Sequence, residues 1–266
     1  MIASLGMIAS LGMYDFGPAM AANDRLWALV RGALRARGIA APDALTRGEG
    51  AYWPAWEAPD LVLSQTCGYP FRARLQGRVT YVGTPDYGVE GCPPGHYNSV
   101  FVVRKDDPRA VLADFDGAPF AFNEALSQSG WAAPQTHATK LGLRLPPVVQ
   151  TGGHLLSAAA VAEGRADIAA LDAVTHALLQ GEPVAAHLRV IARTDPTPGL
   201  PLIAAKGADA EAIFDAVSTA IAALSEGDRA TLRLKGLVRI PLADYLAVPN
   251  PPPPDLLAKR AFAPAG

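Results

Sequence analysis

The sequence predicts a two-lobed α/β protein in which each lobe is a mixed β-sheet flanked by helices. Short apolar runs alternate with longer stretches of helical periodicity, which is typical of α/β domains. A near-complete set of strands and helices lies at residues 99–198, and the elements after it have no sheet of their own. The simplest arrangement places these later elements in a sheet with strands from the first part of the chain. The predicted division is residues 1–98 plus 199–250 for lobe 1, 99–198 for lobe 2 and 251–266 for a proline-rich tail, with two crossings between the lobes.

The elements of lobe 1 are predicted from apolar runs and the residues that end them. A strand is expected near Ile8–Tyr14, followed by a helix from about Met20 to Arg37 that ends at Gly38. After the turn at 195–201, the chain offers a strand and an amphipathic helix that complete the lobe. The remaining elements expected here are the strands Leu61–Ser64, Val79–Gly83 and Leu202–Ala205 and the helix Ala210–Leu224.

Lobe 2 is expected to contain five strands and three helices. The expected strands are Ser99–Val103, Pro119–Phe122, Val148–Thr151, Asp167–Leu171 and Leu188–Arg193. The expected helices are Ser129–Leu141, Gly153–Glu163 and Ala173–Leu179. In the tail, four successive prolines predict an extended polyproline spacer before a short final helix.

Composition and charge exclude several classes of partner. The formal net charge is −2 and the lysines and arginines form no basic stripe, so nucleic acid is not an expected partner. No apolar run is long enough to span a membrane. The N-terminus has no basic segment before its apolar residues, so we expect no secretory signal, and the doublet Met1–Gly6 and Met7–Gly12 is interpreted as a duplication whose second copy begins the fold. A monomer is expected.

The sequence offers little for metal binding or catalysis. Cys67 and Cys92 are too few for a zinc site, and they are compatible either with a disulfide that staples two loops or with two thiols. No nucleophile elbow, zinc-protease motif, phosphate-binding loop or dinucleotide fingerprint is present. An enzyme would have to use Glu124 and Asp172 as an acid and base, which the sequence cannot place together. We therefore expect a binding protein without cofactor or metal.

The segment Asn123–Trp131 follows a predicted strand and opens a helix, and it is the best candidate site. The first N–H groups of a helix lack intrahelical partners and face the positive end of its dipole, so they bind an oxyanion without lysine or arginine. The alternative is an ordinary helix cap by Ser127 or Ser129. A second helix starts after Thr151-Gly152-Gly153 at His154, which is either a ligand donor or a structural histidine.

Other candidates stand at the ends of predicted strands. Asp172 is either an acceptor for the ligand or a cap of the next helix. Four further residues offer neutral donors to a ligand or belong to the core: Tyr14, Gln65, Thr66 and Tyr97. Three tryptophans line an apolar wall or serve packing: Trp53, Trp56 and Trp131.

These segments together resemble the PhnD-like family of phosphate-, phosphite- and phosphonate-binding proteins of bacterial ABC importers, which have the type II periplasmic-binding-protein fold. The resemblance runs from the strand before Tyr14 to about Val248. It rests on Ser127-Gln128-Ser129-Gly130, on Gly152-Gly153-His154 and on Arg165–Asp172, with further agreement at Ser64–Pro70 and Tyr97–Val103.

The resemblance implies a ligand site. In that family a loop similar to Ser-Thr-Ser-Gly and a following histidine cradle the phosphonyl oxygens, which corresponds here to Ser127, Gln128, Ser129 and His154; the family's tyrosine before the crossover corresponds to Tyr97. Gln128 replaces the usual threonine. Members that bind an aminoalkyl tail use acidic residues where this chain has Val174 and Leu200. The departures favour a smaller or less cationic oxyanion, with Asp172 as the remaining acid nearby.

The function implied by the resemblance is capture of a small oxyanion by hinge closure, followed by delivery to an ABC permease from the periplasm. Two alternatives stay open. Cytosolic enzymes of menaquinone or pyrimidine biosynthesis share this fold, and a cytoplasmic location agrees with the missing signal. A stand-alone ligand sensor that has kept the lobes without the transporter is the other alternative.

Overall fold

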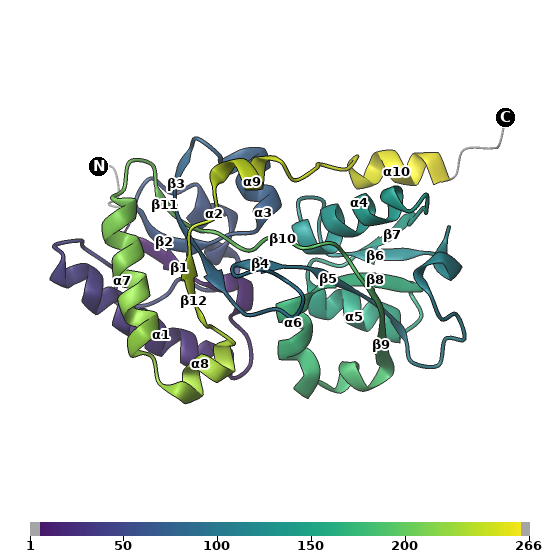
Figure 1. The fold of residues 1–266 in the computed structure, drawn as a ribbon, viewed down its shortest axis with the longest axis horizontal. Coiled ribbons are helices and arrows are strands. Elements are labelled where there is room, and N and C mark those ends of the chain that lie inside the picture. The colour runs from purple at the N-terminus through teal and green to yellow at the C-terminus, as the bar shows by residue number, and fades with distance from the viewer. Residues whose placement is uncertain (1–5, 262–266) are drawn as a thin grey trace. The chain divides into compact units, whose positions relative to one another are not determined.

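The computed structural model describes residues 6–261, and the chain divides into two compact units (Figure 1). The first unit extends to His96 and resumes over Pro198–Tyr245; the second comprises Tyr97–Thr197 and the chain from Leu246 onward. Two of the passages between units carry the short strands β4 (His96–Tyr97) and β10 (Thr197–Pro198), which pair with each other.

A five-stranded mixed sheet in the order β1-β2-β11-β3-β12 organises the first unit. β1 (Ile8–Ser10) runs parallel to β2 (Leu61–Gln65). β11 (Leu202–Ala205) lies between β2 and β3 (Val79–Asp86) and is antiparallel to both, and β12 (Gly236–Val238) pairs with β3. The chain after residue 198 thus supplies a central strand to a sheet begun by the first 86 residues.

Helices cover the sheet of the first unit, and successive residues of β11 serve different clusters. Leu202 and Ala204 belong to a core with α1 (Ala19–Ala36), α7 (Ala210–Ala223) and α8 (Glu226–Leu232), whereas Ile203 belongs to a second cluster with Trp56 and Tyr245. This is the alternation expected of a strand with two buried faces. The other helical segments are η1 (Gly12–Tyr14), η2 (Gly48–Ala51), α2 (Trp53–Trp56), α3 (Gly68–Pro70), η3 (Phe71–Leu75) and α9 (Leu242–Leu246).

The second unit has a five-stranded sheet in the order β7-β6-β8-β5-β9. β6 (Phe120–Phe122) is parallel to β7 (Pro147–Gln150) and to β8 (Ile168–Asp172), while β5 (Ser99–Arg104) is antiparallel to β8 and to β9 (Leu188–Arg193). The carboxyl ends of β6, β7 and β8 therefore meet at one edge of this sheet, beside the start of β5.

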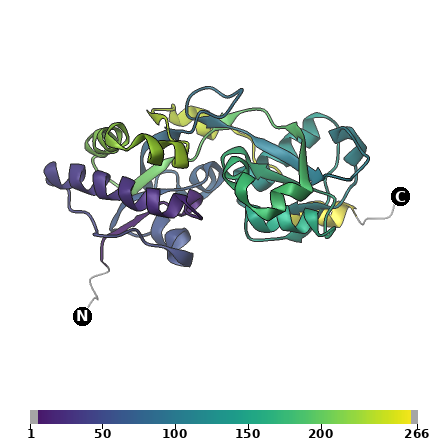
Figure 2. The same ribbon diagram turned by 90° about the horizontal axis from the view of Figure 1, so that it is seen from below.

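Helices follow each of the three parallel strands of the second unit, and Figure 2 shows them in a second view. A π-helix, η5 (Gln128–Ala132), leads without a break into α4 (Ala133–Lys140); the others are α5 (His154–Ala162) and α6 (Ala173–Leu178). Short 3-10 segments are η4 (Leu112–Phe115), η6 (Leu179–Gly181) and η7 (Pro183–His187). The C-terminal helix α10 (Pro254–Ala261) packs beside β7.

Several details differ from the sequence predictions. The first strand ends at Ser10, not near Tyr14, because the chain turns into the 3-10 helix η1. Residues from Leu246 group with the second unit, whereas the sequence placed those up to 250 in lobe 1. Cys67 and Cys92 are thiols, so the disulfide alternative is not adopted. The first copy of the N-terminal doublet lies outside the described residues, apart from Gly6.

Candidate functional site

The strongest candidate site lies at the edge of the second sheet where β6, β7 and β8 end. Each strand leads into a helix whose first residues carry polar side chains: the η5 start, the α5 start and the α6 start. Ser127, Gln128 and Ser129 at the first of these starts are almost fully buried. Five of the predicted residues are thus at or beside these helix starts: Ser127, Gln128, Ser129, His154 and Asp172.

Ser127 is the N-cap of η5. Its Oγ accepts a hydrogen bond from the Gly130 N–H at 2.9 Å, and its carbonyl accepts one from the Ala132 N–H at 2.9 Å. The capping alternative thus describes Ser127. Since the oxygen is used as an acceptor, the Ser127 hydroxyl hydrogen is still available to donate.

Ser129 and His154 join the first two helix starts. Ser129 Oγ lies 2.9 Å from His154 Nε2, and either atom can donate, depending on the tautomer of the imidazole. Burial lowers the pKa of His154 to about 4, so the ring is neutral at neutral pH. The pair therefore contributes hydrogen-bonding groups to the site and no positive charge.

The first N–H groups of α5 have no partner within the helix. Its first intrahelical bond runs from the Ser157 N–H to the Gly153 carbonyl at 2.9 Å, so the N–H groups of His154, Leu155 and Leu156 precede the helical ladder. Gly152 has φ of 86°, in the left-handed region that favours glycine. The two glycines thus bring the backbone round from β7 into the first turn of α5.

Thr151, for which the sequence predicts no role, anchors the same loop. Its Oγ1 is 3.2 Å from the Phe122 carbonyl, 3.1 Å from the Gly153 carbonyl and 2.7 Å from Ser157 Oγ. The Thr151 N–H also donates to the Phe122 carbonyl at 2.8 Å. The signal in the sequence was a threonine at the end of a strand directly before Gly-Gly.

The two acidic residues at this edge have different environments. Asp172 Oδ1 accepts hydrogen bonds from the N–H groups of Val174 and Thr175 at 2.7 and 3.0 Å, so the carboxylate caps α6. Glu124 is half-buried, and burial raises the pKa of its carboxyl group.

In the first unit, two of the predicted residues are linked through a tyrosine that sequence reasoning missed. Gln65 Nε2 donates to the Tyr87 hydroxyl at 2.9 Å, and the Tyr87 ring lies edge-on to that of Tyr14 with 5.0 Å between centroids. Thr66 is fully buried and its N–H donates to the Pro201 carbonyl at 3.0 Å. Tyr87 directly follows β3, which continues three residues beyond the predicted strand Val79–Gly83. Tyr97, also buried, lies on β4 at the boundary of the second unit.

The three predicted tryptophans serve packing. Trp131 is fully buried with its ring 5.0 Å from that of Phe122. Trp56 donates its indole N–H to the Gln65 carbonyl at 3.2 Å, and Trp53 packs on Trp56 with the Arg74 guanidinium over its ring. Of the three, Trp131 alone lies beside the candidate site, because it belongs to η5.

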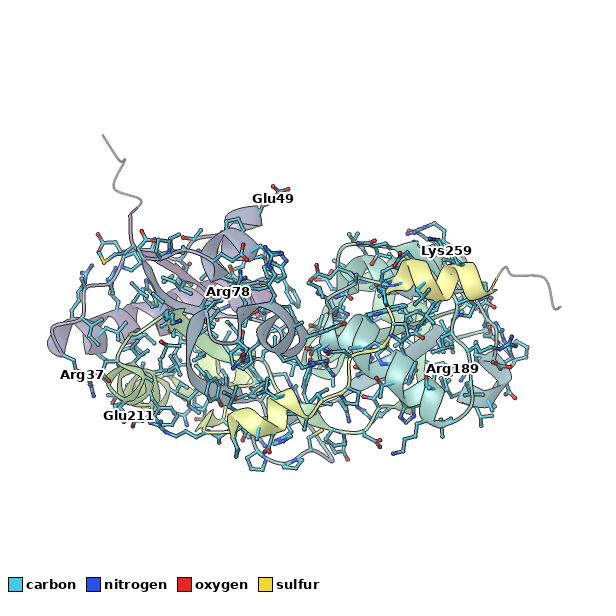
Figure 3. All side chains as sticks on the ribbon, turned by 90° about the horizontal axis from the view of Figure 1, so that it is seen from above. Arg37, Glu49, Arg78, Arg189, Glu211 and Lys259 are labelled. Atoms are coloured by element: carbon cyan, nitrogen blue, oxygen red, sulfur yellow. The ribbon has the colours of Figure 1, made fainter. Side chains whose placement is uncertain are left out.

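Charged residues are spread over the outside of each unit, as Figure 3 shows for Arg37 and Glu49 of the first unit and Lys259 of the second. Among residues 6–261, no group of three or more His, Cys, Asp or Glu side chains is arranged to hold a metal ion. Within the same residues, no helix is long and apolar enough to cross a membrane.

The comparison with protein families decides the relationship. The model of the periplasmic phosphonate-binding proteins of ABC transporters matches residues 60–245. The chain belongs to this phosphonate-binding protein family. Its members are substrate-binding proteins, and the matched part spans β2 to α9 and includes every helix start of the candidate site.

Solved structures share the fold of this phosphonate-binding family member. PhnD1 from Prochlorococcus marinus, in complex with methylphosphonate, has a TM-score of 0.68 at 17% identity, over 90% of this chain and 94% of that one. XAC2383 from Xanthomonas citri, bound to chloride, has a TM-score of 0.65 at 16% identity, over 96% and 95%. A binding protein component of an ABC phosphonate transporter from Pseudomonas aeruginosa has a TM-score of 0.62 at 15% identity, over 90% and 83%. No curated protein matches the chain. At identities this low, the structural similarity shows the shared two-unit α/β fold alone.

Proposed function

We propose that this protein captures a small oxyanion (phosphate, phosphite or a phosphonate) for an ABC importer. The single observation that carries the proposal is the hydrogen bond between Ser129 and His154, which ties two helix N-termini together at one sheet edge. Membership of the phosphonate-binding family supports the ligand class and the transport role.

Physical chemistry favours an anion at this position. The helix that begins with η5 and continues through α4, and the nine-residue α5, both present N–H groups and the positive ends of their dipoles to this edge. The side chains there add hydroxyl, amide and neutral imidazole groups. Such donors bind an oxyanion by geometry and hydrogen bonding instead of by net charge.

The residues of the second unit take distinct parts in this proposal. Ser127 and Ser129 donate hydroxyl hydrogens, Gln128 donates from its amide, and His154 donates or accepts according to its tautomer. Asp172 accepts a hydrogen bond from a protonated ligand oxygen, while it caps α6. Tyr97 donates its phenolic hydrogen.

The predicted residues of the first unit are Tyr14, Gln65 and Thr66, and we propose that they contribute to ligand affinity as well. The bond from Gln65 to Tyr87 supports this role because it fixes the amide in a buried polar setting. No covalent step is involved: the protein binds, carries and releases its ligand.

Calorimetric titration tests the proposal. Wild-type protein is titrated with phosphate, phosphite, methylphosphonate and sulfate, and at least one is expected to bind with a Kd on the order of micromolar. Ser129→Ala and His154→Gln are each expected to weaken that binding at least roughly tenfold. Ser129→Ala removes a donor at the site, and His154→Gln replaces the fixed imidazole by a flexible amide that does not keep its geometry.

Matched substitutions control for general effects. Ser218→Ala on α7 and His187→Gln, an exposed position in η7, are expected to bind as the wild type does. No heat of binding with any of the four oxyanions would contradict the ligand class. Binding that Ser129→Ala and His154→Gln leave unchanged would contradict the site.

A further inference from the structure

Asn123 lies between the two helix starts that Ser129 and His154 join. It directly follows β6, the strand between β7 and β8. Its backbone carbonyl accepts a hydrogen bond from the Gly152 N–H at 2.9 Å, in the loop that leads into α5. The backbone of Asn123 therefore fixes the α5 side of the candidate site.

The side chain of Asn123 fixes the other side. A Cβ added to Gly130 would lie 1.9 Å from Asn123 Oδ1 and 2.6 Å from its Cγ, so the amide group rests directly on the Cα of Gly130 in η5. Oδ1 is buried and has no hydrogen-bond partner among the described residues. In this contact a Cα–H of Gly130 faces the oxygen.

The two glycines that Asn123 contacts lie close in sequence to Ser129 and His154. Gly130 is adjacent to Ser129, and Gly152 is two residues before His154. One residue thus holds both loops, and the 2.9 Å separation of Ser129 Oγ and His154 Nε2 depends on the distance between them. A shift of one loop by the size of a methyl group would break that bond.

We propose that Asn123 is a positioning residue that sets the spacing of the two helix starts, and that Gly130 is required because only a hydrogen atom fits against the Asn123 amide. The proposal rests on the proposed function for its effect on ligand affinity. Its effect on the Ser129–His154 pair does not depend on any ligand.

The test uses a pair of complementary substitutions. Gly130→Ala places a methyl group where Asn123 Oδ1 lies, and Asn123→Ala removes the obstructing amide, so the double variant restores the space. Gly130 lies in the π-helix η5 and does not have a left-handed φ, so its backbone conformation does not itself require glycine. Gly32→Ala on α1 is the matched control, because Gly32 is helical and has no atom within 4 Å of the added Cβ.

Two readouts separate the outcomes. The first is the NMR titration of the His154 ring in ligand-free protein, identified by its loss in His154→Gln. The wild-type pKa is about 4, and Gly130→Ala is expected to move it toward 6.5 as Ser129 separates and water enters. The second is calorimetry with methylphosphonate and phosphite, where Gly130→Ala is expected to weaken binding by roughly tenfold or more.

The double variant decides between positioning and damage. If Asn123 positions the loops through Gly130, Asn123→Ala alone weakens binding and raises the His154 pKa, but less than Gly130→Ala does. The double variant Asn123→Ala/Gly130→Ala then matches Asn123→Ala, with a His154 pKa within about 0.5 and a Kd within about threefold. A Gly130→Ala protein whose His154 signal equals that of the wild type, or a double variant no better than Gly130→Ala, would overturn the proposal. An Asn123→Ala protein that behaves as the wild type in both measurements would also overturn the proposal. If wild-type protein binds none of phosphate, phosphite, methylphosphonate and sulfate, the proposed function fails while the histidine titration still tests the positioning role.

Discussion

The low pKa of His154 makes a measurable prediction about stability. The imidazole has a pKa of about 4 in the folded protein, against 6.5 for an unburied histidine, because burial disfavours its charged form. Between these two values the unfolded chain takes up a proton and the folded protein does not. Stability is therefore lost as pH falls from about 6.5 toward 4, and His154 causes no further loss below that.

The size of the effect follows from linkage. The difference between the two pKa values corresponds to about 3 kcal/mol in total, of which about 2 kcal/mol is lost between pH 7 and pH 5. His137 and His176 also have pKa values lowered by burial, so they contribute in the same direction. The part due to His154 is isolated by comparing the wild type with His154→Gln, which keeps a neutral hydrogen-bonding group beside Ser129.

The second unit offers a local reporter for this experiment. Among the described residues of the second unit, Trp131 is the one tryptophan. A fluorine label on its indole therefore gives a 19F NMR signal that follows the unfolding of this unit in urea. We expect the wild type to lose about 2 kcal/mol more between pH 7 and pH 5 than His154→Gln does. His187→Gln, at an exposed position, should behave as the wild type. An equal loss in the wild type and His154→Gln would refute the lowered pKa of His154 and its neutral imidazole.

Three further substitutions test contacts that hold the units. Ser127→Ala removes the cap of η5 and should lower the unfolding free energy of the second unit by about 1 kcal/mol in urea titrations, with Ser127→Thr nearer the wild type. Arg109→Ala removes the main partner of the buried Asp107 carboxylate, whose pKa is about 2. The free energy of unfolding should fall by about 3 kcal/mol at pH 7. This loss should shrink as pH falls through 3.8 toward 2, because the carboxylate becomes protonated. A pH-independent deficit would count against the ion pair. Tyr245→Phe removes the hydroxyl that contacts Thr84 at 2.6 Å and should cost about 1 kcal/mol in the first unit, measured by thermal unfolding; an unchanged midpoint would show that the bond is not needed.

Much of the strand pattern was predictable because it rests on local apolar runs. β9 and β11 have the predicted bounds, and α1 differs from its prediction by one residue at each end. β12 was missed because a three-residue edge strand with half-buried side chains has no periodic signal. The first strand was predicted too long because η1 continues the apolar run with a different backbone.

The candidate site was predictable as separate segments but not as a geometry. The helix starts at Gln128 and His154 were indicated by serine, glycine and histidine after strands. The bond between Ser129 and His154 spans 25 residues and depends on the order of β7, β6 and β8, which no local pattern fixes. The contact of Asn123 with Gly130 is likewise visible only in three dimensions.

The most direct test of the central claim is a residue-resolved NMR titration of the backbone amides with methylphosphonate or phosphite. If the two helix starts bind the oxyanion, the largest shifts will fall on the N–H groups of residues 127–130 and 153–156. Shifts confined to other parts of the sequence, or saturable binding that leaves these amides unmoved, would contradict it.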